Sequence, residues 1–330
     1  MKQVSMQMIA DALDISKNSV SQALRDAPGV SEETKKLVRS KADELGYKYV
    51  KQNKRIQGEF LILATEFALS QVSFFGEIIK SIDYNCTLKN FKTTTLAVTS
   101  EMIQENQLPA NLTNYSGIFI VSHITDDYIS NIVNQGIPCV VVDHHSPKVL
   151  TDCVLTKNTD GAYSAVEFLI KHHCKKIGFI GDIDFSPSYL ERFRGYQRAL
   201  KEHDIDLDSK ILITKIKENQ AELFSKLKEI KQMPDAWFCV NSGLAYILNY
   251  YLQSDKYQIP EDISIICFDN TEFTQMSNPK ITNISTDLSY MGKQAVITMS
   301  ERLAVPDSPY IHKQILPQLL ELGTVHPLNI

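Results

Sequence analysis

Four polar residues occupy comparable places in the sequence, each after an apolar strand-like run or at the start of a helix-like pattern. They are Asp143, Arg192, Asn241 and Asp269. Carboxylates accept pairs of hydrogen bonds and arginine offers a fixed fork of donors, so the set suits the vicinal hydroxyls of a polyol. We therefore expect these side chains to bind a small-molecule effector. Two simpler explanations remain open: Asp269 is a turn residue, and Arg192 is a surface residue paired with Glu191.

Aromatic residues are expected to supply apolar faces beside those polar groups. They are Phe74, Phe75 and Trp237. A tryptophan is also typical of a hydrophobic core, and that alternative stays open for Trp237.

A second set of polar side chains lies on the helix expected after Ser16. Its outward residues are Lys17, Asn18, Ser21 and Gln22. Asn and Gln can bond adenine bidentately and Lys can reach guanine acceptors, so these residues suit base edges in the major groove. The alternative is that any short amphipathic helix has a polar outer face.

Three short helices within residues 4–46 must position these base-reading candidates. Serines that can act as N-caps precede the helices: Ser5, Ser16 and Ser31. Gly46 is a plausible C-terminal cap of the third helix. Two short helices across a tight turn, with a third as buttress, predict a helix-turn-helix whose second helix fits the major groove.

Beyond Gly58, short apolar runs alternate with amphipathic helix patterns, and the rhythm restarts after residue 158. This alternation predicts parallel sheets with right-handed crossovers. We expect an all-α three-helix headpiece followed by α/β, in which two doubly wound parallel-sheet lobes face a ligand cleft. Strands are expected at 60–64, 93–98, 117–121, 139–143, 176–180, 211–214, 236–240 and 263–268, and helices at 75–88, 162–172, 189–203, 220–231, 243–253 and 290–302.

Charge is distributed unevenly along the chain. Residues 1–57 carry 11 Lys and Arg against 7 Asp and Glu, whereas the remainder carries 23 against 32. A basic module on an acidic body is typical of a DNA-binding headpiece joined to a domain with another task. The excess is small, which favours two headpieces acting together.

Composition excludes several other classes. The 330 residues are 43% hydrophobic, enough for a sizeable core, with no apolar run long enough to span a membrane. The polar N-terminus is unlike a signal peptide. Six scattered cysteines favour free thiols in a reducing cytoplasm, where we expect the protein, at the nucleoid when bound to DNA.

Metal binding and catalysis find little support in the motifs. Residues 143–145 and 172–174 contain adjacent histidines, which would point to opposite faces of a strand. Nucleophile elbows, phosphate-binding loops and zinc-protease helices are absent from the sequence. We therefore expect no metal, no cofactor and no catalytic residues.

Several segments carry a family resemblance: 9–24, 30–34 and 44–47 near the N-terminus, then 158–162, 168–170, 176–181, 188–192, 234–236, 260–264 and 268–271. In these segments the chain resembles the LacI/GalR transcription regulators. The resemblance implies a body of the periplasmic-binding-protein type, crossed three times between lobes, near residues 158, 283 and 312. The expected domains are a headpiece (1–47), a hinge or linker (48–58) and an effector-binding and dimerisation domain (59–330). Its N-lobe would comprise about 59–157 and 284–312, and its C-lobe about 158–283 and 313–330.

The joint between headpiece and body is polar and basic. The resemblance implies a hinge helix here that folds on DNA and wedges an apolar side chain into the minor groove. Ile56 occupies the wedge position, and Lys54 stands where Arg is common. Tyr49 and Val50 replace the usual Pro-Asn helix start, so a flexible basic linker is the alternative.

The resemblance implies a sequence-specific DNA-binding transcription regulator, a repressor rather than an enzyme. Its partners would be palindromic double-stranded operator DNA, a second copy in a homodimer and a carbohydrate effector, with no membrane. Lys17, Asn18 and Gln22 occupy operator-reading positions, and many members have Arg where this chain has Gln22. Ser242 stands where Asp is common, which leaves a purine, sugar-phosphate or protein co-repressor as alternatives. A two-lobed enzyme is the remote alternative.

Overall fold

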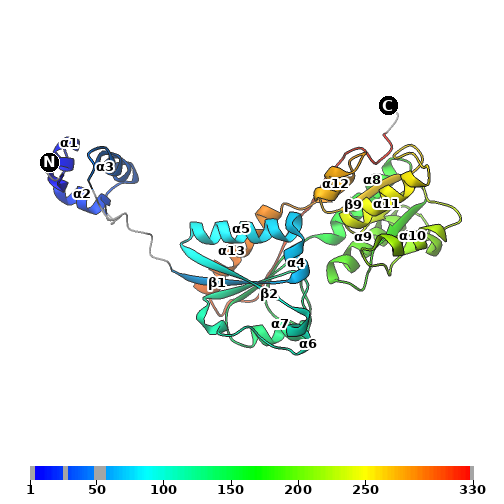
Figure 1. Cartoon of the computed structure of the whole chain (residues 1–330), viewed down its shortest axis with the longest axis horizontal. Coiled ribbons are helices and arrows are strands. Elements are labelled where there is room, and N and C mark those ends of the chain that lie inside the picture. The colour runs from blue at the N-terminus through cyan, green and yellow to red at the C-terminus, as the bar shows by residue number, and fades with distance from the viewer. Residues whose placement is uncertain (1–3, 25–28, 48–56, 328–330) are drawn as a thin grey trace. The chain divides into compact units, whose positions relative to one another are not determined.

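The computed structural model describes residues 4–24, 29–47 and 57–327 (Figure 1). The chain divides into two compact units, Met1–Gln57 and Gly58–Ile330.

The described residues of the first unit form three helices, α1 (Met6–Leu13), α2 (Lys17–Leu24) and α3 (Glu32–Glu44). Each expected cap is confirmed: the hydroxyl oxygens of Ser5, Ser16 and Ser31 each accept the backbone N–H three residues later. Gly46 follows α3 with φ +73°, which a glycine adopts without strain. The helices share one small core, formed by Ile9, Ala10, Val20, Ala23, Leu24, Val38 and Ala42.

The second unit contains two six-stranded sheets, which define two lobes. The N-lobe sheet is parallel throughout, in the order β11-β5-β4-β3-β1-β2. Its strands are β1 (Gly58–Thr65), β2 (Phe91–Val98), β3 (Gly117–Val121), β4 (Cys139–Val142), β5 (Asp152–Thr156) and β11 (His312–Ile315). Its helical segments are α4 (Glu66–Ser70), η1 (Val72–Gly76), α5 (Glu77–Leu88), α6 (Ser100–Gln104), η2 (Leu112–Asn114), α7 (Asp126–Val133) and α13 (Leu288–Ala304).

Strand β1 shows why its apolar run forms a buried central strand. Phe60 and Ile62 pack with α5 and α13 on one face of the sheet, whereas Leu61 and Leu63 pack with α7 on the other. Successive side chains of a strand alternate between faces, and helices cover both faces here (Figure 1). The continuous apolar sequence is the consequence.

The C-lobe sheet has the order β12-β10-β9-β8-β6-β7, with only β12 antiparallel to its neighbour among these strands. Its strands are β6 (Ile177–Ile180), β7 (Leu212–Ile213), β8 (Ala236–Cys239), β9 (Ser264–Phe268), β10 (Thr282–Ser285) and β12 (Gln318–Leu320). Its helical segments are α8 (Asn158–Lys171), α9 (Pro187–Glu202), η3 (Ser209–Ile211), α10 (Gln220–Lys228), α11 (Ser242–Ser254) and α12 (Glu272–Met276).

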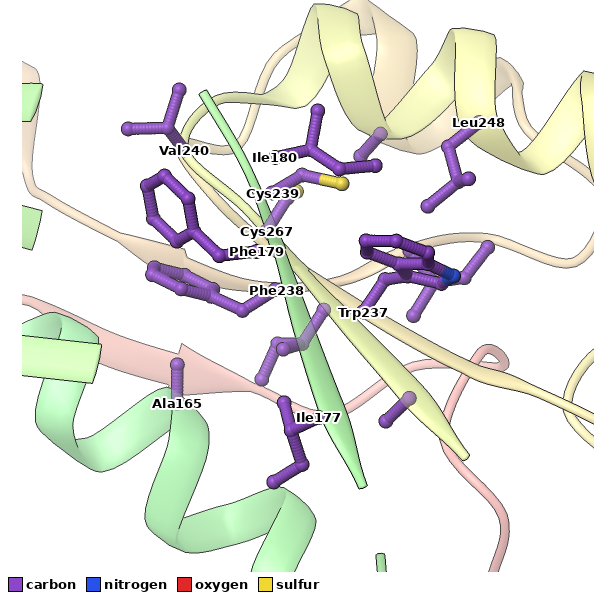
Figure 2. Close-up of a cluster of buried hydrophobic side chains, with 14 of the residues drawn as sticks. Ala165, Ile177, Phe179, Ile180, Trp237, Phe238, Cys239, Val240, Leu248 and Cys267 are labelled. Carbon is purple, nitrogen blue, oxygen red and sulfur yellow. The ribbon is translucent and has the colours of Figure 1, made fainter. Parts of the chain in front are cut away.

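Close packing in the C-lobe depends on two glycines. A Cβ at Gly178 would lie 2.4 Å from the ring of Trp237, which occupies that space in the core (Figure 2). A Cβ at Gly195 would lie 2.2 Å from the Thr159 carbonyl oxygen, so glycine lets α9 approach α8.

The chain crosses between the lobes three times. The first crossing, at Lys157, agrees with the expected position. The second follows β10 and the third lies between Ile315 and Gln318, each a few residues later than expected, because β10 pairs with β9 and β11 pairs with β5. The crossings are tied together: the Lys157 N–H donates to the Ile315 carbonyl (2.9 Å), and the Thr156 and Thr286 hydroxyls are 3.1 Å apart. In the described ranges no helix has the length and apolarity of a membrane span.

Candidate effector pocket and DNA-reading surface

A pocket lies where the carboxyl ends of strands from both lobes meet. It encloses about 650 Å³, part of it open to solvent. Six of the seven expected effector residues line it: Phe74, Phe75, Asp143, Arg192, Asn241 and Asp269.

We expected Trp237 to line the effector pocket, and this prediction is wrong. Its side chain is fully buried in the C-lobe core, and Figure 2 shows it beside Leu248 of α11. Trp237 is the second residue of β8, so it lies within the sheet, whereas Asn241 follows the strand end and reaches the pocket. Trp237 is therefore a residue of the hydrophobic core, as the alternative interpretation of the sequence held.

Arg192 is a buried residue of α9, not a surface residue paired with Glu191. Its Nη1 and Nη2 donate to the two carboxylate oxygens of Asp269, at 2.9 and 3.3 Å. Nη1 also donates to the Val240 carbonyl (2.7 Å) and Nε to Asn158 Oδ1 (2.9 Å). The guanidinium lies 3.8 Å from the centre of the Phe268 ring. Arg192 therefore fixes Asp269 at the pocket wall.

Asp143 and Asp269 follow β4 and β9, and both adopt left-handed backbone angles, φ +60° and +70°. Asp tolerates this conformation better than most residues. Asp143 Oδ1 is buried with no hydrogen-bond partner among the described residues. Burial raises the pKa of Asp143 to about 7, a rise that Arg192 opposes. Burial also raises the pKa of Asp269, again against the effect of Arg192.

Asn241 lines the pocket with its side chain already engaged. Its Oδ1 caps α11 by accepting the Leu244 N–H (2.9 Å). Its Nδ2 donates to the Tyr189 hydroxyl (2.7 Å) and to Glu218 Oε2 (3.0 Å). Asn241 thus positions Tyr189 and Glu218, which also border the pocket. Burial raises the pKa of Glu218, and the Asn241 hydrogen bond opposes the rise.

Histidines of the N-lobe form two further contacts near the pocket. The Nδ1 atoms of His123 and His144 lie 3.3 Å apart, so one ring must donate and the other accept. Burial lowers the pKa of His144 to about 4 and also lowers the pKa of His123, which disfavours the charged form of both rings. His145 Nε2 lies 2.7 Å from Glu191 Oε1 of α9 and forms a contact between the lobes.

Sequence reasoning missed twelve lining residues, whereas Ser242 was placed at the pocket by the family resemblance. Tyr189 had a usable signal, because it lies one helical turn before Arg192 on α9. Ser122 directly follows the strand end of β3, the same signal that identified Asp143. The full set missed is Phe67, Gln71, Ser122, His123, Phe185, Ser186, Ser188, Tyr189, Glu218, Gly243, Thr271 and Phe273.

The outer face of α2 presents the expected base-reading candidates. Lys17 and Asn18 are exposed, and Ser21 and Gln22 are half-buried. The opposite face is buried in the headpiece core. Lys54 and Ile56 of the expected hinge lie outside the described residues. No group of three His, Cys, Asp or Glu side chains within the described ranges is arranged to hold a metal ion.

A two-lobed ligand-binding fold that follows a helix-turn-helix defines a class: DNA-binding proteins with a separate effector domain. A family model described as "Periplasmic binding protein-like domain" matches residues 166–324. The NTD biosynthesis operon regulator NtdR of Bacillus subtilis is 27% identical over 90% of this chain and 92% of its own length. The HTH-type transcriptional repressor PurR of Vibrio atlanticus is 26% identical over 97% of this chain and 98% of its own length.

Solved structures share the whole fold. The transcriptional regulator CelR in complex with cellobiose has a TM-score of 0.73 at 18% identity and covers 97% of this chain and 99% of its own. The Lac repressor dimer bound to operator and the anti-inducer ONPF has a TM-score of 0.70 at 19% identity, covering 98% and 99%. Along most of its length the chain is similar to transcription regulators of the LacI/GalR type, and residues 166–324 match a periplasmic-binding-protein-like domain. Its relatives are transcription regulators and not enzymes.

Proposed function

We propose that this regulator represses transcription as a cytoplasmic homodimer on a palindromic operator, under the control of a carbohydrate bound between its lobes. The observation that carries the effector assignment is the placement of Asp143 and Asp269 on different lobes of one aromatic-lined pocket. Carboxylates that face one another across a cleft can accept hydroxyl donors from both sides of a sugar ring. A ligand that binds both lobes would favour one degree of lobe closure over another.

The charges on the pocket wall support a carbohydrate over a sugar phosphate. Arg192 is the only Lys or Arg among the lining residues of the described ranges, and it is already committed to Asp269. A phosphate would meet carboxylates without a free cation.

A purine is the second candidate. Aromatic side chains around the pocket, among them Phe74, Phe185 and Tyr189, could stack on a base. The similarity to relatives named PurR repressors supports this second candidate.

DNA reading is assigned to the outer face of α2. Lys17, Asn18 and Gln22 would contact base edges, with Ser21 beside them. Around this reading helix, Ser5, Ser16 and Ser31 at the helix starts and Lys54 in the joint would contact phosphates, and Ile56 would act as the minor-groove wedge. In this proposal residues 1–47 read DNA, 48–58 transmit the signal and 59–330 bind effector and dimerise. The operator-bound dimer of the similar Lac repressor structure supports the pairing.

The test is a thermal-shift screen over sugars, sugar phosphates and purines, since a ligand that binds only the folded state raises its apparent stability. Each stabilising ligand is then added to titrations of a palindromic operator selected from random duplexes. We expect a carbohydrate to raise the melting temperature and to change operator affinity. Stabilisation by purines alone would assign the pocket to the second candidate, and turnover of a bound glycoside would contradict the regulator assignment.

A further inference from the structure

The charges that border the effector pocket do not balance. Three carboxylates line it, those of Asp143, Glu218 and Asp269, against the single guanidinium of Arg192. Arg192 forms an ion pair with Asp269, whereas Asp143 and Glu218 form none with any residue of the described ranges. A neutral ligand that closed the pocket would leave two carboxylates away from water, either charged without a counter-ion or protonated, and a cationic ligand removes that cost.

Arg192 has little capacity left to compensate them. Four of its hydrogen bonds go to Asn158, Val240 and Asp269, and its side chain is 2% exposed. Burial lowers the pKa of His123, the other basic side chain on the wall, and so disfavours its charged form. A cationic partner for Asp143 and Glu218 would therefore have to come from the ligand, since the described residues around them supply none.

Both unpaired carboxylates have an oxygen available to a donor. Asp143 Oδ1 is buried and has no partner among the described residues. Asn241 holds Glu218 through Oε2, while Oε1 lies over Gly243, where a Cβ would be 1.6 Å away. Glycine at the start of α11 thus makes room for this carboxylate at the pocket wall.

We propose that the pocket binds a cationic carbohydrate, a sugar carrying at least one ammonium group, which donates to Asp143 or Glu218 while its hydroxyls contact Asp269. This inference rests on the proposed function of the pocket as a carbohydrate site. The ring faces of Phe185 and Tyr189 on the same wall can add cation–π attraction to the ammonium group.

The experiment compares matched sugars by calorimetry on the full-length protein at pH 7. One set is the glucosamine disaccharide, its N,N′-diacetyl form and cellobiose; a second is glucosamine, N-acetylglucosamine and glucose. We expect an ammonium sugar to bind at least about tenfold more tightly than both neutral counterparts, a difference of about 1.4 kcal/mol. Equal or tighter binding of the neutral sugars overturns the inference and leaves the proposed function standing. Binding of purines or sugar phosphates in place of every sugar overturns both.

Variants separate charge recognition from general binding. Asp143→Asn and Glu218→Gln should each weaken the ammonium sugar about tenfold while changing cellobiose affinity far less. Asp184→Asn is the matched control, because Asp184 is an exposed acid of the same lobe as Glu218 that does not line the pocket. A loss that is equal for charged and neutral sugars, or equal in the control, contradicts the role of these carboxylates.

Discussion

Asparagine substitutions at the two pocket aspartates, Asp143 and Asp269, should change the free energy of unfolding in opposite directions. Both residues adopt left-handed backbone angles that Asn also tolerates, so each substitution mainly removes charge. Asp143 is half-buried and unpaired, whereas Asp269 is paired with buried Arg192. Asp143→Asn should therefore stabilise the ligand-free protein, and Asp269→Asn should destabilise it.

The size of the Asp143 effect follows from its titration. Burial raises its pKa from 3.8 to about 7, so the folded state holds a proton that the unfolded chain releases near pH 4. Stability consequently falls as pH rises between these two pKa values, by about 1.4 kcal/mol per pH unit. Because the side chain is partly exposed, we expect Asp143→Asn to recover roughly 2–4 kcal/mol above pH 7 and little at pH 4.

Asp269→Asn changes stability through Arg192, the ion-pair partner of Asp269. It leaves the Arg192 guanidinium, which is 2% exposed, without a counter-charge, and breaking such a pair costs about 3 kcal/mol or more. Urea unfolding of both variants at pH 5 and pH 8 measures these differences. An Asp143→Asn variant that is no more stable than wild type at pH 8, or a gain that does not grow with pH, would refute the reasoning.

Three further predictions concern DNA reading, the joint and the contact between lobes. Gln22→Ala should weaken specific operator binding by about 1–3 kcal/mol, and gel shifts that show the same loss on random DNA would exclude a base contact. Ile56→Ala should weaken operator binding and spare effector affinity; unchanged operator affinity would leave the joint as a plain linker. The Glu191 hydrogen bond raises the pKa of His145, so wild type should exceed His145→Gln in stability below about pH 6.5 and lose that advantage as pH rises through the raised pKa. A stability difference that stays flat across this range would count against the His145–Glu191 contact.

The strands of purely apolar sequence could be predicted from local pattern. The run 117–121 matches β3, and 60–64 lies inside β1. Strands β5 and β10 were not predicted, because their burial depends on distant partners. Asp152 of β5 is buried in an ion pair with Arg302 (2.8 Å), which lies 150 residues away in sequence. Polar Thr282 of β10 is fully buried, and its N–H donates to Thr324 (2.9 Å).

The pocket residues also separate into those that the local sequence predicts and those that depend on distant partners. Asp143 and Asp269 could be predicted because they directly follow apolar strands, and parallel strands bring their carboxyl ends to one edge. Trp237 was misplaced because composition does not distinguish a residue within a strand from one at its end. Glu218 carried no local signal, since it becomes part of the pocket only through Asn241, which follows a different strand.

The central claim is that a ligand in the pocket between the lobes controls operator binding. The most direct test is an anisotropy titration of a selected palindromic operator with wild type and Asp143→Asn, each with and without the sugar that stabilises wild type most. The account predicts that the sugar changes the operator affinity of wild type at least about tenfold. It predicts that Asp143→Asn binds operator normally without sugar and requires about tenfold more sugar for the same response. The stability expected of this variant removes unfolding as an explanation. A variant that responds as wild type does, or a sugar that binds without changing operator affinity, would contradict the account.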